Sequence, residues 1–156
     1  MTSSPTEGSP APGFSLPADG GGTVSLESLK GKNVVIFFYP KADTPGCTKE
    51  SMDFSRLKPA FEKANTAVVG VSADAVAAQD KFKAKHALTV PLASDPGREM
   101  IERYGVWVQK SMYGKTFMGI ERATFLVDGG GVIRKVWRNV KVEGHAEAVL
   151  EAAKAL

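Results

Sequence analysis

Short apolar runs separated by turn residues are the main feature of the chain. Residues 33–39 and 66–72 are apolar except at their ends and rich in β-branched and aromatic side chains, which is typical of strands buried on both faces. Residues 124–127 and 132–137 flank the sequence Asp128-Gly129-Gly130-Gly131 and predict a hairpin. A second hairpin is predicted near the N-terminus, from residues 14–16 and 23–26 across residues 19–22, and a brief strand over residues 90–93.

Helical patterns fall between these strands. A helix is expected from Thr44, with Met52, Phe54 and Leu57 among its apolar positions and with a kink or division at Pro59. Further helices are expected over residues 74–86, with Phe82 on the buried face, over residues 94–104 and over residues 144–156. The alternation of strands and helices, followed by an antiparallel pair, predicts an α/β fold with a mixed central sheet flanked by helices.

Length and composition indicate one ordinary globular domain. The chain has 156 residues, of which 43% are hydrophobic and 24% are charged. The first residues are rich in Ser, Pro and Gly and contain no apolar stretch, so we expect no secretory signal there. We expect a flexible N-terminal arm over residues 1–12 and a single domain over residues 13–156.

Charge and cysteine content exclude several classes of protein. The net charge is +3, but the 20 basic residues are scattered among 17 acidic ones, so no nucleic-acid partner is expected. No run of apolar residues is long enough for a transmembrane helix, so no membrane partner is expected. The single cysteine excludes a framework of structural disulfides, which suits a reducing compartment and predicts a cytoplasmic protein.

That cysteine, Cys47, stands at the predicted start of a helix. Thr44 suits the N-cap and Pro45 the first helical position, which puts Cys47 third. The first turn of a helix has unpaired N–H groups and a positive dipole, and Lys41 and Lys49 add positive charge nearby. A thiolate is stabilised in such surroundings, so the sequence predicts a reactive sulfur nucleophile.

Other uses of a cysteine fit the sequence less well. A lone cysteine is most often a small buried apolar residue, but polar and turn-forming neighbours surround Cys47. A dithiol oxidoreductase needs a second cysteine where Thr44 stands, and a cysteine hydrolase needs a histidine base. His86 and His145 both suit surface helix positions. Peroxide reduction through a sulfenic acid remains, and so does a redox sensor that signals by oxidation without turnover.

Four segments of the chain resemble the peroxiredoxin family. Pro40, Thr44 and Cys47 spell P-x-x-x-T-x-x-C, and residues 39–48 resemble the subgroup called PrxQ or bacterioferritin-comigratory protein. The likeness continues at Ser111-Met112-Tyr113-Gly114-Lys115, at Gly119-Ile120-Glu121-Arg122-Ala123-Thr124-Phe125 and at Val136-Trp137-Arg138.

The resemblance implies a thioredoxin-like fold with an extra N-terminal hairpin and a thiol-dependent peroxidase that acts on hydrogen peroxide and alkyl hydroperoxides. Cys47 is then the sulfur that attacks the peroxide, and Arg122 lies beside it. Thr44 and the N–H group of Gly46 are candidate donors to the reacting oxygens, and Pro40 shields the sulfur from water. Neither a metal nor an organic cofactor is implied.

The chain departs from this family at the second, resolving cysteine. One common position for it holds Met52, and another falls at residues 82–84, which contain no cysteine. The pattern is that of a one-cysteine enzyme, whether natural or made from a two-cysteine one. The sulfenic acid must then be reduced by an external thiol such as thioredoxin, glutaredoxin or a small thiol.

Several neighbours of the site carry less specific expectations. Glu50 follows Cys47 by three residues and either orients Arg122 or simply places favourable charge in the first helical turn. An aromatic and methionine cluster surrounds a glycine-containing loop and is expected to pack in the core or at its rim; it comprises Trp107, Tyr113, Phe117 and Met118. A collar for the organic part of a peroxide and a dimer contact are the alternatives, and a monomer or weak homodimer is expected.

Overall fold

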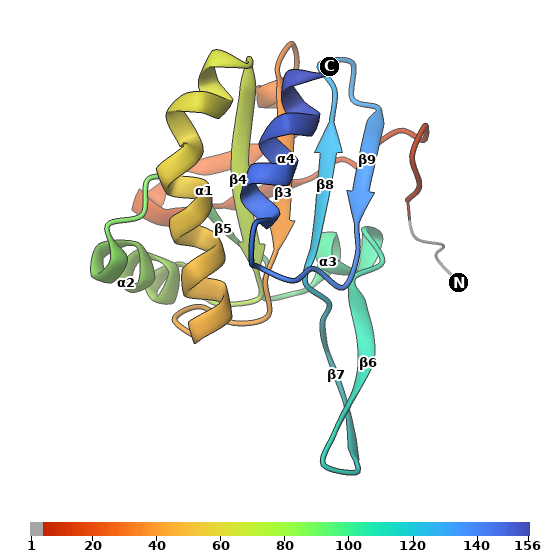
Figure 1. Ribbon diagram of the computed structural model, residues 1–156. Helices are drawn as coiled ribbons and strands as arrows, with labels where there is room; N and C mark the ends of the chain where they lie inside the picture. Colours follow the sequence, from red (N-terminus) through yellow and green to blue (C-terminus); the bar gives the residue numbers. More distant parts are fainter. Residues whose placement is uncertain (1–4) are drawn as a thin grey trace.

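A five-stranded sheet forms the centre of the molecule (Figure 1). The computed structural model describes residues 5–156. The strand order is β5-β4-β3-β8-β9, and β1 with β2 and β6 with β7 form two separate two-stranded sheets. Along the chain the elements are β1 (Ser15–Pro17), η1 (Asp19–Gly21), β2 (Thr23–Ser25), η2 (Glu27–Leu29), β3 (Asn33–Phe38), α1 (Pro45–Lys63), β4 (Thr66–Ser72), α2 (Val76–His86), β5 (Leu92–Ser94), α3 (Glu99–Arg103), β6 (Trp107–Met112), β7 (Lys115–Ile120), β8 (Ala123–Val127), β9 (Ile133–Trp137) and α4 (His145–Lys154).

The central strand β3 is buried on both faces, as its continuous apolar run predicts. It pairs in parallel with β4 and antiparallel with β8. Val35 and Phe37 belong to the apolar cluster under α1 and α4, whereas Ile36 and Phe38 belong to the cluster on the other face. Because β8 and β9 also pair antiparallel, the sheet is mixed, which confirms that part of the predicted fold.

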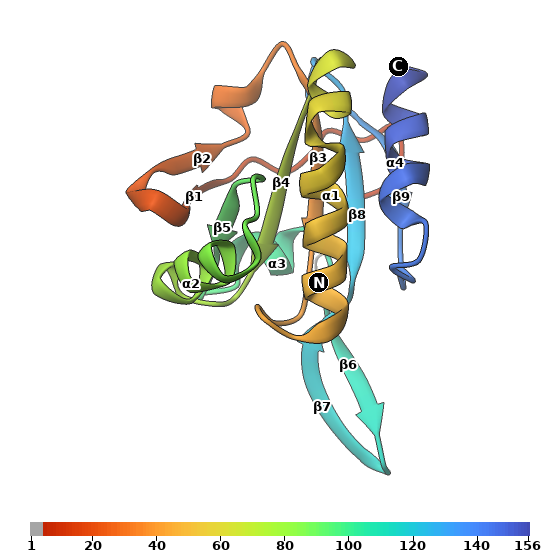
Figure 2. The same ribbon diagram turned by 60° about the vertical axis from the view of Figure 1, so that its left-hand side comes forward.

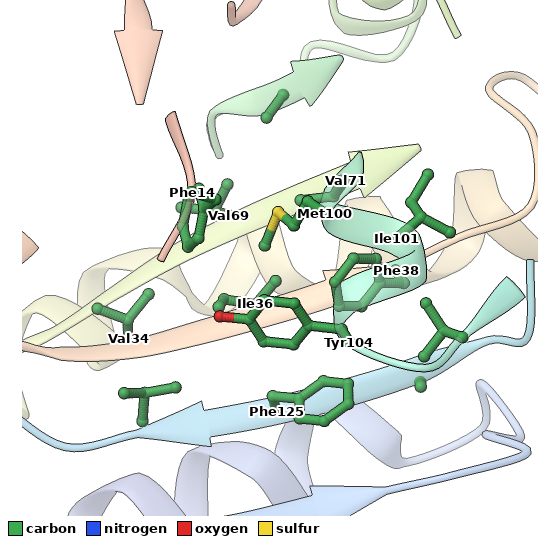
Figure 3. Packing of buried hydrophobic residues seen from close by; sticks show 14 of the residues in the cluster. Phe14, Val34, Ile36, Phe38, Val69, Val71, Met100, Ile101, Tyr104 and Phe125 are labelled. Atoms are coloured by element: carbon green, nitrogen blue, oxygen red, sulfur yellow. The ribbon is translucent and has the colours of Figure 1, made fainter. Parts of the chain in front are cut away.

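Helices cover both faces of this sheet. α1 and α4 lie side by side on one face, and α3 with the N-terminal segment lies on the other (Figures 1 and 2). Figure 3 shows the core on the second face, where Tyr104 and Met100 from the region of α3 pack against Ile36, Phe38 and Phe125 of the sheet. Within residues 5–156 no helix has both the length and the apolar character needed to cross a membrane.

Gly70 on β4 is required by a close approach of side chains. A Cβ atom at this position would lie 2.7 Å from Cζ of Phe37 and 3.1 Å from Cδ2 of Leu92. Any side chain here would therefore displace the Phe37 ring, which stacks on Phe54 of α1 with ring centroids 4.5 Å apart. The glycine thus leaves the space in which α1 packs on the centre of the sheet.

Helix α1 runs from Pro45 to Lys63 without interruption, so of the kink or division expected at Pro59 the division is wrong. Proline has no N–H, which leaves the carbonyl of Ser55 without its helical partner. That carbonyl accepts a hydrogen bond from the hydroxyl of Thr89 (3.3 Å), and the N–H of Thr89 donates to the hydroxyl of Ser55 (3.0 Å). A distant segment thus replaces the bond that the proline removes.

Helix α3 is shorter than the helix expected over residues 94–104, because it spans only Glu99–Arg103. Asp95 explains the late start. Its carboxylate accepts hydrogen bonds from the backbone N–H groups of Glu99 (3.1 Å) and Ile101 (2.9 Å). An acidic side chain that satisfies the first N–H groups of a helix belongs before the helix rather than within it.

The segment before β1 is attached to the sheet. The N–H of Gly8 donates to the carbonyl of Ile133 (2.8 Å), and the N–H of Ile133 donates to the carbonyl of Ser9 (2.9 Å). Of the arm expected over residues 1–12, residues 1–4 lie outside the described residues. Contacts with the sheet are therefore present from Gly8 onward, ahead of the expected domain start. The N-terminal hairpin itself, β1 with β2, is confirmed.

Strands β6 and β7 form a hairpin that projects from the body of the molecule (Figures 1 and 2). Its turn is Tyr113-Gly114, whose φ angles of 53° and 76° are those of a two-residue hairpin turn. Trp107 at the base of the hairpin packs against the core, as expected. Tyr113, Phe117 and Met118 are exposed, so the prediction that they pack in the core or at its rim is wrong.

Candidate active site

Cys47 lies on the first turn of α1, a few residues beyond the end of the central strand β3. Because α1 begins at Pro45, Cys47 is its third residue, which confirms the predicted helix start. The N–H of Thr48 donates to the carbonyl of Thr44 (2.8 Å) and closes the first turn. The Cys47 side chain has no exposed surface. The sulfur is therefore held in a dry setting at the positive end of a 19-residue helix.

One guanidinium joins the sulfur to a buried carboxylate. Nη2 of Arg122 lies 3.4 Å from Sγ of Cys47, and Nη1 lies 2.8 Å from Oε1 of Glu50. Glu50 is 1% exposed. This ion pair is the contact that Glu50 would need in order to orient Arg122. Arg122 thus bonds two groups on the same turn of α1.

Burial determines the charge of this pair. Burial raises the pKa of Glu50 to about 7, although Arg122 acts in the opposite direction. Burial alone would lower the pKa of Arg122, but the neighbouring Glu50 and Cys47 outweigh it and raise that pKa. Among the described residues, Oε2 of Glu50 has no hydrogen-bond partner. The guanidinium keeps its charge, while the carboxyl group holds a proton below neutral pH.

Glu50 should lower the stability of the protein as the pH rises from about 4.5 to about 7. In the unfolded chain the Glu50 carboxyl has its ordinary pKa of 4.5, whereas in the folded protein it keeps its proton up to about 7. The folded state therefore binds more protons in this window, so the free energy of unfolding falls with rising pH. Denaturant titrations of the wild type and Glu50→Gln at a series of pH values measure this difference.

The exposed Glu151 on α4 provides the matched control. Glu151→Gln should keep the pH dependence of the wild type, because its carboxylate remains in water in both states. If Glu50→Gln retained the wild-type slope as well, Glu50 would not be the group that titrates in this window.

The backbone around Arg122 is held by the loop that follows β9. The carbonyl of Arg122 accepts a hydrogen bond from the N–H of Val140 (3.0 Å). The carboxylate of Glu121 accepts two bonds from the guanidinium of Arg138 (2.7 and 2.9 Å) and one from the N–H of Asn139 (2.9 Å). Together these contacts fix the residues that precede β8 and thereby the direction of the Arg122 side chain.

The lack of a side chain at Gly46 leaves room for the guanidinium of Arg122. A Cβ atom at position 46 would lie 3.1 Å from Nη2 of Arg122, which is closer than ordinary van der Waals contact. A side chain there would push the guanidinium away from Cys47. The expected role of the Gly46 N–H toward a peroxide stays a prediction.

Thr44 occupies the N-cap position with extended backbone angles (φ −91°, ψ 155°), but its side chain does not cap the helix. Its hydroxyl instead donates a hydrogen bond to the carbonyl of Lys41 (2.8 Å). The expectation of a side-chain cap is therefore wrong. The donor role expected for Thr44 toward the reacting oxygens would require this hydroxyl to turn away from Lys41, and it stays a prediction. In the observed orientation the hydroxyl oxygen can still accept a hydrogen bond at the site.

A pocket of about 370 Å³ adjoins the guanidinium, and its lining comprises Pro40, Val108, Gln109, Lys110, Glu121, Arg122, Asn139 and Val140. Two predicted site residues, Pro40 and Arg122, therefore meet at one pocket. Lys110 was missed from the sequence because the strand β6 that carries it was not recognised. Burial lowers the pKa of Lys110 and Arg122 adds to this effect, whereas Cys47 and Glu121 oppose it.

A buried polar network holds the loop between β3 and α1. The N–H of Ala42 and the hydroxyl of Ser72 both donate to Oδ2 of Asp74 (2.7 Å each). The amide of Gln79 on α2 donates to the hydroxyl of Ser72 (3.0 Å) and accepts from the hydroxyl of Tyr39 (2.6 Å). The loop that carries Pro40 and Thr44 is thereby tied to both β4 and α2.

The two histidines do not contact the sulfur. His145 is 7% exposed, so its expected surface position is wrong, and its Nε2 lies 2.8 Å from the hydroxyl oxygen of Thr124. Burial and, to a smaller extent, Arg122 lower the pKa of His145 to about 4, so its ring is neutral near pH 7. His86 is bonded to Asp43 at the surface (2.8 Å). Within residues 5–156, Arg122 is the hydrogen-bond partner of Sγ of Cys47.

Neither expected position for a second thiol holds a cysteine. Met52 is 47% exposed on α1, and Lys83 in the middle of the second region pairs with Asp19 (2.7 Å). The described residues also contain no cluster of three or more His, Cys, Asp or Glu side chains that would hold a metal ion.

Comparison with known proteins finds a matching family model and several relatives. The AhpC/TSA family model matches residues 8–136. Peroxiredoxin Bcp of Xanthomonas campestris is 47% identical over 148 residues, which cover 94% of this chain and 92% of that protein. Peroxiredoxin Bcp of Bacillus subtilis is 43% identical over 147 residues, covering 94% of each.

Solved structures agree in fold. A cysteine-to-serine mutant of Xylella fastidiosa PrxQ matches with a TM-score of 0.93 and 38% identity over 98% of both chains. The bacterioferritin comigratory protein of Xanthomonas campestris, which has alkyl peroxide reduction activity, matches with a TM-score of 0.87 and 45% identity over 91% of this chain and 90% of that one. The mixed sheet with its flanking helices is a thioredoxin-like fold, as expected. The chain belongs to the AhpC/TSA family and, within it, to the Bcp/PrxQ subgroup of the peroxiredoxins.

Proposed function

We propose that the protein is a thiol-dependent peroxidase that reduces hydrogen peroxide and alkyl hydroperoxides at Cys47. The observation that carries the proposal is the 3.4 Å contact between Nη2 of Arg122 and Sγ of Cys47. A guanidinium in contact with a sulfur at a helix start favours the thiolate, which is the nucleophile. A thiolate stabilised in this way needs no histidine base, which agrees with the positions of His86 and His145.

In the first step the thiolate attacks the terminal oxygen of the hydroperoxide. The S–O bond forms as the O–O bond breaks, so the sulfur is oxidised to a sulfenic acid and the peroxide is reduced. The departing oxygen takes a proton from water and leaves as an alcohol or as water. Arg122 stabilises the charge that develops on the oxygens, with the N–H of Gly46 as a second donor. The oxygen of the Thr44 hydroxyl accepts a hydrogen bond from the O–H group of the peroxide. Pro40 keeps bulk water away from the sulfur.

The second step requires a reductant from outside the chain, because Cys47 is its single cysteine. We propose thioredoxin, glutaredoxin or a small thiol in this role, and the cytoplasm, where such thiols are kept reduced, as the location. Cys47 has no exposed surface, so attack by a protein thiol requires the first turn of α1 to move. One chain carries the whole set of site residues, which suits a monomer or weak homodimer.

Consumption of peroxide in the steady state tests the proposal. With dithiothreitol present, the wild type should reduce many molecules of hydrogen peroxide or cumene hydroperoxide per chain, and Cys47→Ser should reduce none above background. Oxidation of Cys47 that no thiol converts into repeated turnover would contradict the peroxidase and favour a redox sensor.

A further inference from the structure

The β6–β7 hairpin connects the active-site pocket to an exposed apolar surface. Near its base, Val108 and Lys110 line the pocket next to Arg122. Lys110 pairs across the hairpin with Phe117, and Met112 pairs with Lys115. Because directly opposed residues of a strand pair share a face, the face that begins at the pocket continues outward to the tip.

The outer part of this hairpin exposes large apolar side chains. Tyr113 is 97% exposed, Met112 58%, Met118 50% and Phe117 45%. Within residues 5–156, these four account for most of the large apolar side chains that are exposed, the others being Met52 and Leu156. Aromatic and methionine side chains gathered on one projecting element are typical of a protein-binding surface.

The charge on the hairpin has one sign. β6 and β7 contain Lys110 and Lys115 and no acidic residue. In the part of the chain that the structure describes, neither lysine forms an ion pair, whereas Arg122 and Arg138 near the site both do. A partner that presents acidic groups around an apolar patch would therefore complement the hairpin.

A second copy of the chain does not meet this requirement. Two hairpins in mutual contact would bring four unpaired lysine side chains together, and each chain has a net charge of +3. Like charges placed face to face oppose association. The charge distribution therefore selects a partner of another kind, with an acidic surface.

We propose that the β6–β7 hairpin is the docking surface for an acidic dithiol protein of the thioredoxin class, which reduces oxidised Cys47. This inference rests on the proposed function. The first partner thiol attacks the sulfenic acid, so that a mixed disulfide forms and water leaves. The second partner thiol attacks that disulfide, which releases the Cys47 thiolate and oxidises the partner. The base of the hairpin borders the active-site pocket. A protein bound along the hairpin therefore reaches the pocket and is held next to Cys47.

Three hairpin variants test the proposal: Tyr113→Ser, Phe117→Ser and Lys115→Glu. The assay compares turnover driven by an acidic thioredoxin, kept reduced by its reductase, with turnover driven by dithiothreitol. Aromatic anchors of an interface typically contribute about tenfold or more in affinity, so each serine variant should raise the KM for thioredoxin by about tenfold. Lys115→Glu should raise it as well and should weaken its dependence on salt. The dithiothreitol-driven rate should stay unchanged for all three.

Leu156→Ser and Lys154→Glu are matched controls, because both positions lie at the C-terminus, at the opposite end of the molecule from the hairpin (Figure 1). Neither should change the KM for thioredoxin.

Unchanged KM values in the hairpin variants would overturn the proposal, as would turnover with dithiothreitol but not with thioredoxin. A homodimer that the hairpin variants dissociate would overturn it in favour of self-association. Absence of turnover with dithiothreitol in the wild type would instead contradict the proposed function.

Discussion

Arg122→Met should slow the oxidation of Cys47 by peroxide by about 10²–10³-fold, because loss of one fixed donor to a developing negative charge has an effect of this order. The variant removes the group that lies 3.4 Å from Sγ, while an unbranched apolar stem remains at this position. Stopped-flow measurement of a single turnover without reductant isolates this step from the later reduction.

The interpretation depends on the fold remaining intact, and Glu50 is the main concern. Without Arg122, the carboxyl group of Glu50 is left buried and without its ion-pair partner, which is costly for a charged group. The double variant Glu50→Gln with Arg122→Met removes that charge and should be as slow as the single variant. Arg103→Met, at an exposed arginine on α3, should oxidise at the wild-type rate. Fast oxidation in Arg122→Met would show that another group stabilises the transition state.

The oxidised protein should carry a sulfenic acid and no internal disulfide, and excess peroxide should inactivate it. The chain has no second thiol to trap the sulfenic acid, so without a reductant a further peroxide converts it to sulfinic acid, which thiols do not reduce. Intact mass spectrometry should show one added oxygen after stoichiometric peroxide and two after an excess. Activity with dithiothreitol should survive the first treatment and be lost after the second.

The control is the same treatment with reductant present from the start. In it the protein should keep both its unoxidised mass and its activity. Non-reducing gels test the remaining possibility, a Cys47–Cys47 bond between two chains. The sulfur has no exposed surface, so such a dimer should be a minor product. A predominant covalent dimer, or activity that persists through excess peroxide without any thiol, would contradict a one-cysteine mechanism.

The central strands and the position of Cys47 could be predicted because their signals are local. A continuous apolar run identifies a buried strand wherever it occurs, and β4 begins and ends at the predicted residues, Thr66 and Ser72. Thr44 and Pro45 likewise specify a helix start within a few residues of the cysteine. Such features do not depend on what the rest of the chain does.

The features that were missed depend on partners far along the chain. Pro59 stays inside a helix because Thr89 bonds the carbonyl that the proline leaves free. His145 is buried because the first turn of α4 faces Phe54 on α1, with the two rings 6.0 Å apart. The β6–β7 hairpin has solvent along most of its length, so it lacks the alternation of apolar and polar residues by which half-buried strands are recognised.

The distance in sequence between Cys47 and Arg122 has a consequence for the synthesis of the protein. Seventy-five residues separate them, and they meet only when β8 pairs with β3. A ribosome that adds 5–20 residues per second needs roughly 4–15 s to make that segment. During this interval the nascent chain has a cysteine without its guanidinium. If Arg122 activates Cys47 as proposed, the sulfur becomes a fast target for peroxide only after β8 has been made and has paired with β3, and shorter nascent chains are spared this oxidation.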